Sequence, residues 1–245
     1  MAARPRRHLP RVDSTQAEAC RLLEAGEPAG FVVTADAQTA GRGREGRSFH
    51  SPVGGGLWLS VTALTRRPPA ESPAFPVAMA VAAAEALEAT AGLGVSLRWP
   101  NDLMVGRLKI GGVLADSRPG PEGSRLVLGL GVNLALENFP QELLGVATSA
   151  ALLGNQIPTP DELLAALLPR LDAFLATLEV GRPDTLLKRW RGRCRTLGRK
   201  VSLKVGAETV DGILEDLSLS DLVLKTPAGQ RRIPSGHVAR LTELP

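Results

Sequence analysis

The spacing of apolar residues changes near Gly198, and this change limits the folds open to the chain. Before it, runs with helical spacing alternate with short β-branched runs, which is the pattern of a body built from helices and strands. Residues 200–241 instead form short alternating runs separated by turns, as in a small β-barrel or sandwich. The pattern predicts two domains, one over residues 1–195 and one over residues 196–245.

Within the larger part, helix caps, glycines and apolar runs indicate where the elements lie. The helix over 13–26 has Asp13, Ser14 or Thr15 available as a cap, and the Ala-rich helix over 72–92 ends at Gly92. We expect helices over 13–26, 72–92, 140–154, 160–181 and 183–194, and strands over 30–38, 54–64, 95–100, 102–106, 108–117 and 124–136.

Composition excludes several classes of protein. The two cysteines, Cys20 and Cys194, are far apart and lie in no CxxC or Cys/His pattern, which argues against a disulfide scaffold or a zinc site. The longest apolar stretch is interrupted by Glu85 and Glu88, so no run spans a bilayer, and no apolar segment follows the basic start. The net charge is +4, but acidic residues are interspersed among the basic ones, so the charge favours anionic partners only weakly. We expect a soluble, cytoplasmic protein.

Residues 38–52, QTAGRGREGRSFHSP, form a loop in which three arginines alternate with three glycines; we call it the Gly/Arg loop. Its G-x-G-x-x-G spacing is not followed by an apolar helix, so a Rossmann site is not indicated, and no kinase or P-loop motif occurs. A solvated surface loop and an RNA-binding RGG segment remain alternatives. We favour a mobile loop that closes over an anion, because arginine binds phosphate and carboxylate and glycine lets the backbone approach. Its arginines are Arg42, Arg44 and Arg47, and its glycines are Gly41, Gly43 and Gly46.

Three other segments combine polar residues with turns or glycines. Lys109 precedes Gly111 and Gly112 in an apolar strand, where a compact positive charge suits a ligand, although a strand-edge lysine is the alternative. The segment RWPNDLMV places polar residues at a turn between strands, and LGLGVNLA places glycines inside a strand, where a flat ring can lie against it.

Taken together, these segments resemble the biotin–protein ligases. The resemblance rests on motifs in the order found in that family, spanning residues 13–134, of which the Gly/Arg loop, W-P-N-D and K-x-G-G in series are the most specific. The matching pieces are DSTQAEA, ADAQTAGRGREGRSFHSPVGGGLWLSV, LRWPNDLMV, RLKIGGVLADS and LGLGVNL.

The resemblance implies an α+β fold: a catalytic domain similar to that of class II aminoacyl-tRNA synthetases, with a mixed sheet and helices, followed by a small SH3-like β-barrel. It also implies two steps. Biotin and ATP give biotinyl-AMP and pyrophosphate, with Mg²⁺ accompanying the phosphates. A lysine of a biotin carboxyl carrier protein then attacks the mixed anhydride.

The resemblance also implies roles for individual residues. Lys109, Arg44 and Arg42 would be catalytic, and Asp102 would help to place Mg²⁺. Biotin would contact Ser14, Thr15, Gln38, Arg42, Gly43, Arg44, Lys109, Gly111 and Gly112. ATP or the adenylate would contact Arg42, Arg44, Arg47, Trp99, Asn101, Asp102 and Asn133.

Some positions depart from the family pattern. Gln16 stands where Asn is usual, and His50 stands where Trp is common. Because the catalytic motifs begin at Asp13, we expect a short form without an N-terminal DNA-binding domain and no sequence-specific DNA binding. We also expect no membrane partner and a monomer or homodimer.

Two other functions remain open. Lipoate ligases and octanoyltransferases have a fold that resembles this one. A thioester mechanism would need a cysteine near the glycine motifs, and neither Cys20 nor Cys194 is near them. An RNA-binding protein that uses the basic residues 189–200 is the alternative of a different class.

Overall fold

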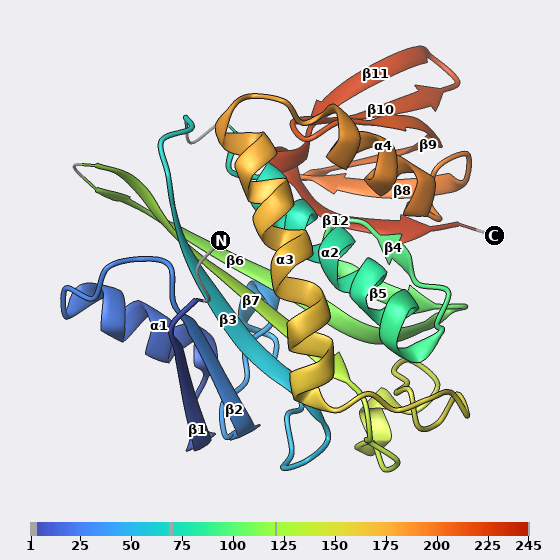
Figure 1. Ribbon diagram of the computed structural model, residues 1–245. Helices are drawn as coiled ribbons and strands as arrows, with labels where there is room; N and C mark the ends of the chain where they lie inside the picture. Colours follow the sequence, from blue (N-terminus) through green and yellow to red (C-terminus); the bar gives the residue numbers. More distant parts are fainter. Residues whose placement is uncertain (1–3, 69–70, 121, 245) are drawn as a thin grey trace.

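The protein is described by a computed structural model that covers residues 4–68, 71–120 and 122–244. Its strands form two sheets (Figure 1). The larger sheet has seven strands in the order β1-β2-β3-β7-β6-β5-β4. Only β1 and β2 pair in parallel, and every other pair is antiparallel. Its strands are β1 (Arg6–Val12), β2 (Val32–Gln38), β3 (Gly56–Thr65), β4 (Ser96–Arg98), β5 (Asp102–Val105), β6 (Leu108–Gly120) and β7 (Gly123–Asn133).

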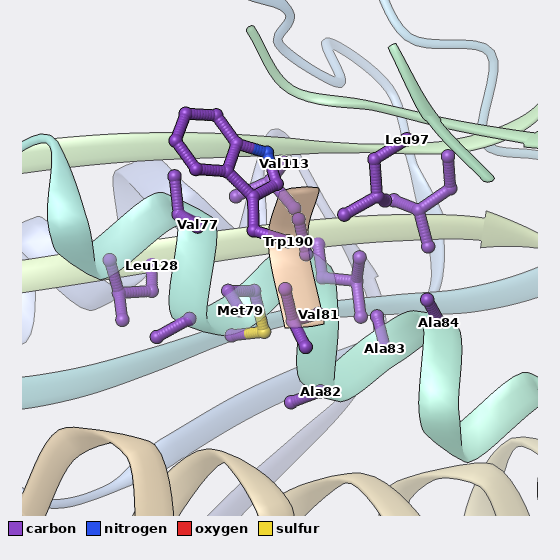
Figure 2. Packing of buried hydrophobic residues seen from close by; sticks show 14 of the residues in the cluster. Val77, Met79, Val81, Ala82, Ala83, Ala84, Leu97, Val113, Leu128 and Trp190 are labelled. Carbon is purple, nitrogen blue, oxygen red and sulfur yellow. The ribbon is translucent and has the colours of Figure 1, made fainter. Parts of the chain in front are cut away.

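Helices α2 (Ala74–Ala91) and α3 (Pro160–Glu179) cover one face of this sheet, as Figure 1 shows. Alternate residues of β7, such as Leu128 and Leu130, pack with them in the main apolar core, whereas Val127 points to the other face and packs with α1 (Thr15–Glu24). In Figure 2, Val113 and Trp190 lie beside the side chains of α2. The face of the sheet toward α2 and α3 is therefore largely apolar.

Helix α2 is the one described helix that is long and apolar enough to cross a membrane, and 72% of that stretch is buried inside the protein. Its many alanines let it lie close to the sheet and to α3, so its burial explains its composition. Helix α4 (Asp184–Arg193) then leads to the second sheet.

The second sheet has five antiparallel strands in the order β11-β10-β9-β8-β12. The all-β character expected for the end of the chain is confirmed; the more specific SH3-like barrel stays a prediction. Its strands are β8 (Lys200–Val205), β9 (Glu208–Leu217), β10 (Asp221–Thr226), β11 (Gly229–Pro234) and β12 (Val238–Glu243).

One predicted helix is wrong. Residues 140–154 contain only a 3₁₀ turn at Gln141–Leu143, followed by further turns. Gly145 and Gly154 adopt the left-handed conformation, with φ of 71° and 68°, which interrupts a helix. The other four helices are confirmed as α1, α2, α3 and α4.

Strand β1 was not predicted from the sequence. Its residues are mostly exposed and include three arginines, so they carry no apolar alternation. The strand exists because its backbone pairs with the buried β2, for example at Arg7 with Val33. Tertiary pairing, and not local preference, decides such an edge strand.

We predict that Leu87→Ala lowers the free energy of unfolding by about 2–5 kcal/mol, because it removes a fully buried side chain from α2. Leu144→Ala is the matched control, since Leu144 is 63% exposed and its loss should change stability by less than about 0.5 kcal/mol. Chemical denaturation of both variants measures this. Equal losses would contradict the described core.

Candidate active site

Glycines lie in the middle of the sheet face that α2 and α3 leave uncovered. Cross-strand pairing places Asp102, Gly112, Gly131 and Trp58 in one row across β5, β6, β7 and β3. An added Cβ on Gly131 would lie 2.6 Å from the ring of Phe49, which comes from the Gly/Arg loop. Gly112 and Gly131 thus form a flat surface, which we call the glycine floor, and the Gly/Arg loop lies on it.

The Gly/Arg loop is held by its own backbone. The Gly43 N–H donates to the Arg47 carbonyl at 2.7 Å, and the Phe49 N–H donates to the Gly41 carbonyl at 2.8 Å. A Cβ on Gly41 would lie 2.4 Å from the Phe49 carbonyl oxygen, so this approach requires glycine. The expected arginine-rich loop is therefore a folded turn rather than a disordered tail.

A cavity of about 980 Å³ lies between this loop, the turn after β4 and strand β12 of the second sheet. Seven arginines line it, against three carboxylates, so its potential favours an anion. The arginines are Arg44, Arg47, Arg98, Arg107, Arg195, Arg199 and Arg240, and the carboxylates are Glu45, Asp102 and Glu243.

Asp102 joins two cations at the wall of the cavity. The Lys109 Nζ lies 2.6 Å from its Oδ1, and an Arg98 guanidinium nitrogen lies 2.6 Å from its Oδ2. Burial alone would raise the pKa of Asp102, but the nearby Lys109 charge and the bonds from Lys109 and Arg98 hold that pKa below its ordinary value of 3.8. Asp102 is thus a stable anion that fixes the ammonium of Lys109.

The two glycines after Lys109 have different neighbours. A Cβ on Gly112 would lie 3.1 Å from both Cε and Nζ of Lys109, so the lysine side chain lies across Gly112. A Cβ on Gly111 would instead lie 2.6 Å from the Gly131 carbonyl oxygen, which belongs to the backbone of β7. Gly111 therefore permits sheet pairing, and Gly112 makes room for the side chain of Lys109.

A polar cluster lies at the start of α1. Ser14 caps the helix, and the N–H and Oγ1 of Thr15 donate to the Gln38 Oε1 at 2.9 and 3.2 Å. Ser60 of β3 donates to Thr15 at 3.0 Å and to the Oε1 of Gln16 at 3.1 Å. Ser14, Thr15, Gln16 and Ser60 are all buried, and their bonds to one another and to Gln38 hold the cluster in one arrangement.

Gln16 also bonds across the sheet. Its Nε2 donates to Asp116 at 2.9 Å and to the Val127 carbonyl at 3.0 Å, and a Cβ on Gly129 would lie 2.5 Å from its Oε1. The structure thus uses the extra length of Gln16, relative to asparagine, for these two bonds. This placement requires glycine at position 129, because a Cβ there would collide with the Gln16 Oε1.

The predicted nucleotide residues fall into two groups. Arg44, Arg47, Trp99, Asn101 and Asp102 all line the large cavity. The remaining two do not line it. Arg42 lies in an adjacent groove of about 770 Å³ beside Leu114 and Asp116, and Asn133 is buried, where its Nδ2 donates to the Thr148 carbonyl at 3.0 Å.

Sequence reasoning missed three contributors. Phe49 covers Gly131, Arg98 neutralises Asp102, and Thr148 contacts Asn133. Arg98 directly precedes W-P-N-D and Phe49 lies within the Gly/Arg loop, so both were adjacent to recognised motifs. Nothing in the local sequence indicated Thr148, because its role depends on a contact between distant segments.

The residues do not fit a metal site held by the protein. Among the described residues, no group of three His, Cys, Asp or Glu side chains is placed to hold a metal ion. Both oxygens of Asp102 already face cations. We therefore assign no step to a metal bound by Asp102.

Comparison with known proteins identifies the family. Residues 8–133 match the family model described as "Biotin/lipoate A/B protein ligase family". The "Biotin--[acetyl-CoA-carboxylase] ligase" of Paracoccus denitrificans is 30% identical over 240 residues, which cover 94% of this chain and 98% of that protein. The chain belongs to the biotin/lipoate A/B protein ligase family.

Other members of the ligase family resemble the chain in part or in whole. The "Bifunctional ligase/repressor BirA" of Bacillus spizizenii is 37% identical over 141 residues, and the chain spans only 43% of its length. The biotin protein ligase of Aquifex aeolicus, solved in complex with biotin and ATP, has a TM-score of 0.84 and 29% identity, covering 99% of this chain and 100% of that one. The fold of this ligase family, with its mixed sheet and helices, is thus shown.

We predict that Gly112→Ala leaves the protein folded but displaces the ammonium of Lys109, because the added Cβ meets the flexible end of a side chain. Gly111→Ala should instead lower the unfolding temperature, because the added Cβ meets backbone. Thermal unfolding and ligand-dependent ATP–pyrophosphate exchange distinguish the two. Loss of exchange at full stability is expected for Gly112→Ala, and the reverse pattern would contradict the described contacts.

We also predict that Asp102 stabilises the fold in a pH-dependent way. Its pKa is lower in the folded state, so its contribution is present above about pH 4, near the unfolded pKa, and is lost as the pH falls through the folded pKa. Asp102→Asn should therefore destabilise the protein more at pH 7 than at pH 3. Chemical denaturation at both values measures this, and a constant difference would contradict the ion-pair account.

Proposed function

We propose that the chain is an ATP-dependent biotin–protein ligase that forms biotinyl-5′-AMP and transfers biotin to a lysine of a biotin carboxyl carrier protein. The observation that carries the proposal is Lys109, held by Asp102 beside the arginine-lined cavity and across the glycine floor. The names of the Paracoccus and Aquifex relatives support biotin as the acid and ATP as its activator.

In the first step, the biotin carboxylate attacks the α-phosphorus of ATP and pyrophosphate leaves. We infer that Lys109 lies between the carboxylate and the α-phosphate, while Arg42, Arg44 and Arg47 hold the phosphates. Negative charge moves toward the leaving pyrophosphate, and cations already in place stabilise that state. The lowered pKa of Asp102 keeps a negative charge 2.6 Å from the Lys109 Nζ, which fixes the position of that group.

Binding of the two substrates follows the two ends of the site. We infer that Ser14, Thr15 and Gln38 bind the ring end of biotin, and that Gly43, Gly111 and Gly112 lie along its tail. Trp99, Asn101, Asp102 and Asn133 would then contact or support the nucleotide. Asn133 is buried and lies outside the cavity lining, so its proposed role is to support the nucleotide site rather than to line the cavity.

In the second step, the acceptor amine attacks the carbonyl carbon of the adenylate, and AMP leaves with the bonding electrons. The Gly/Arg loop would keep water away from the anhydride until then. The name of the Paracoccus relative supports a carboxyl carrier protein of acetyl-CoA carboxylase as the partner. We further propose a catalytic domain over 1–195, an SH3-like domain over 196–245, a cytoplasmic location, no sequence-specific DNA binding, and a monomer or homodimer.

The RNA-binding alternative is weakened by the structure of residues 189–200. Most arginines of this run lie close to carboxylates of the same chain: Arg189 is 2.8 Å from Glu85, and Arg191 is 3.0 Å from Asp216. Arg193 likewise pairs with Glu88. These arginines link α4 to α2 and to the second sheet, so they are not a free basic surface.

The experiment that tests the proposal is acid-dependent ATP–pyrophosphate exchange with biotin, lipoate and octanoate in separate reactions. Exchange with biotin alone is expected. Exchange with lipoate or octanoate instead would make the chain a neighbouring member of the family. No exchange with any acid would overturn the adenylation mechanism, and RNA binding would be examined next.

We predict that Lys109→Ala lowers the rate of biotin-dependent exchange by at least about 100-fold, because no other described cation occupies its place over Gly112. Lys225→Ala is the control, since Lys225 is an exposed lysine of β10 in the second sheet. Its exchange rate should match that of the unmodified protein. A normal rate for Lys109→Ala would reject its assigned role.

A further inference from the structure

Residues 146–150 lie beside the start of β6, and we propose that they form a bracing segment that positions Lys109 against Asn133 for adenylate formation. The inference rests on the proposed function. The segment belongs to the connection between β7 and α3, which the sequence alone predicts as helical. It does not contribute to the lining of the arginine-rich cavity, so its role is to position other residues rather than to bind substrate.

The bracing segment takes the place of a missing strand beside Lys109. Strand β7 ends at Asn133, and the last pairing of β6 with it is at Gly111, so the backbone of Lys109 extends beyond β7. The Lys109 N–H donates to the Val146 carbonyl at 2.9 Å, and the Thr148 N–H donates to the Lys109 carbonyl at 2.9 Å. Both backbone groups of Lys109 that face this side are therefore satisfied by the bracing segment.

The same segment also holds Asn133. The Asn133 Nδ2 donates to the Thr148 carbonyl at 3.0 Å, and the Ala150 N–H donates to the Asn133 carbonyl at 3.3 Å. Thr148 thus bonds to Lys109 through its N–H and to Asn133 through its carbonyl. One residue sets the separation between the proposed catalytic lysine and the proposed nucleotide asparagine.

Ser149 anchors the bracing segment to the chain on either side. Its side chain is fully buried; the Oγ donates to the Leu136 carbonyl at 2.5 Å and accepts from the Leu152 N–H at 3.1 Å. Gly145, with φ of 71°, makes the bend that brings the chain back toward β6. Anchors at both ends give the segment a single position.

This position matters because the Lys109 side chain has little freedom. It lies across Gly112 and bonds to Asp102, so a shift of its backbone moves the ammonium away from the transferring phosphate. A displacement of about 1 Å can cost about 100-fold in rate. The bracing segment should therefore affect kcat more than the KM for biotin, since the polar cluster around Thr15 lies elsewhere.

A matched glycine pair tests this. Gly145 and Gly154 are both exposed, both have positive φ, and neither has an atom within 4 Å of an added Cβ, so alanine strains both equally. Gly145 precedes the bracing segment and Gly154 follows it. We expect Gly145→Ala to lower kcat of biotin-dependent exchange by about tenfold with KM for biotin within about twofold, and Gly154→Ala to change neither, at a temperature where both are folded.

A second pair tests the anchor directly. Ser149→Ala removes the hydroxyl of the bracing segment, and Thr159→Ala removes a hydroxyl that caps α3. Both lose a side-chain bond to a backbone N–H, but only the first touches residues 146–150. Hydrogen exchange followed by NMR should show faster exchange of the Lys109 and Thr148 amides in Ser149→Ala and unchanged exchange of both amides in Thr159→Ala.

The outcomes separate this inference from the proposed function. Equal kcat values for Gly145→Ala and Gly154→Ala, with the unmodified protein active, would overturn the bracing role. Inactivity of the unmodified protein with biotin would overturn the proposed function instead. In that case amide exchange still decides: unchanged protection of Lys109 in Ser149→Ala would overturn the brace, and lost protection would support it.

Discussion

The two faces of the seven-stranded sheet carry different side chains, and the rest of the structure depends on this difference. One face is apolar and is covered by α2 and α3, which supplies the main core. On the other face, Gly112, Gly129 and Gly131 make room for Lys109, Gln16 and Phe49, which lie where larger side chains would stand. Burial of the first face is the dominant favourable term in folding, and it holds the strands that carry the second face in register.

A partly buried cluster of charged side chains lies at the edge of the glycine floor. Asp102 is bonded to both Lys109 and Arg98, so its negative charge is compensated where solvent screening is reduced. The more exposed arginine pairs of α4 contribute about 0–1 kcal/mol each and join α4 to α2 and to the second sheet. The surplus of arginines in the cavity then remains available for an anion.

Local pattern predicted most of the elements because most of them agree with their tertiary surroundings. The cap at Ser14 and the left-handed Gly92 mark the ends of α1 and α2, and both can be recognised from short segments. The edge strand β1 and residues 140–154 are different. Strand β1 is polar and forms by pairing with β2, whereas residues 140–154 have amphipathic spacing but bond to Lys109 instead of forming a helix. Contacts between distant segments override local preference in both cases.

Local sequence predicted helices α1 to α4, the all-β end of the chain, and the motifs that resemble the biotin–protein ligases, because these depend on residues close together in the chain. The folded arrangement alone shows that Arg98 shares Asp102 with Lys109, that Phe49 lies on Gly131, and that Thr148 joins Lys109 to Asn133. The physical reason is that each of these contacts requires strand register or a folded connection, and neither has a signature in a short segment of sequence.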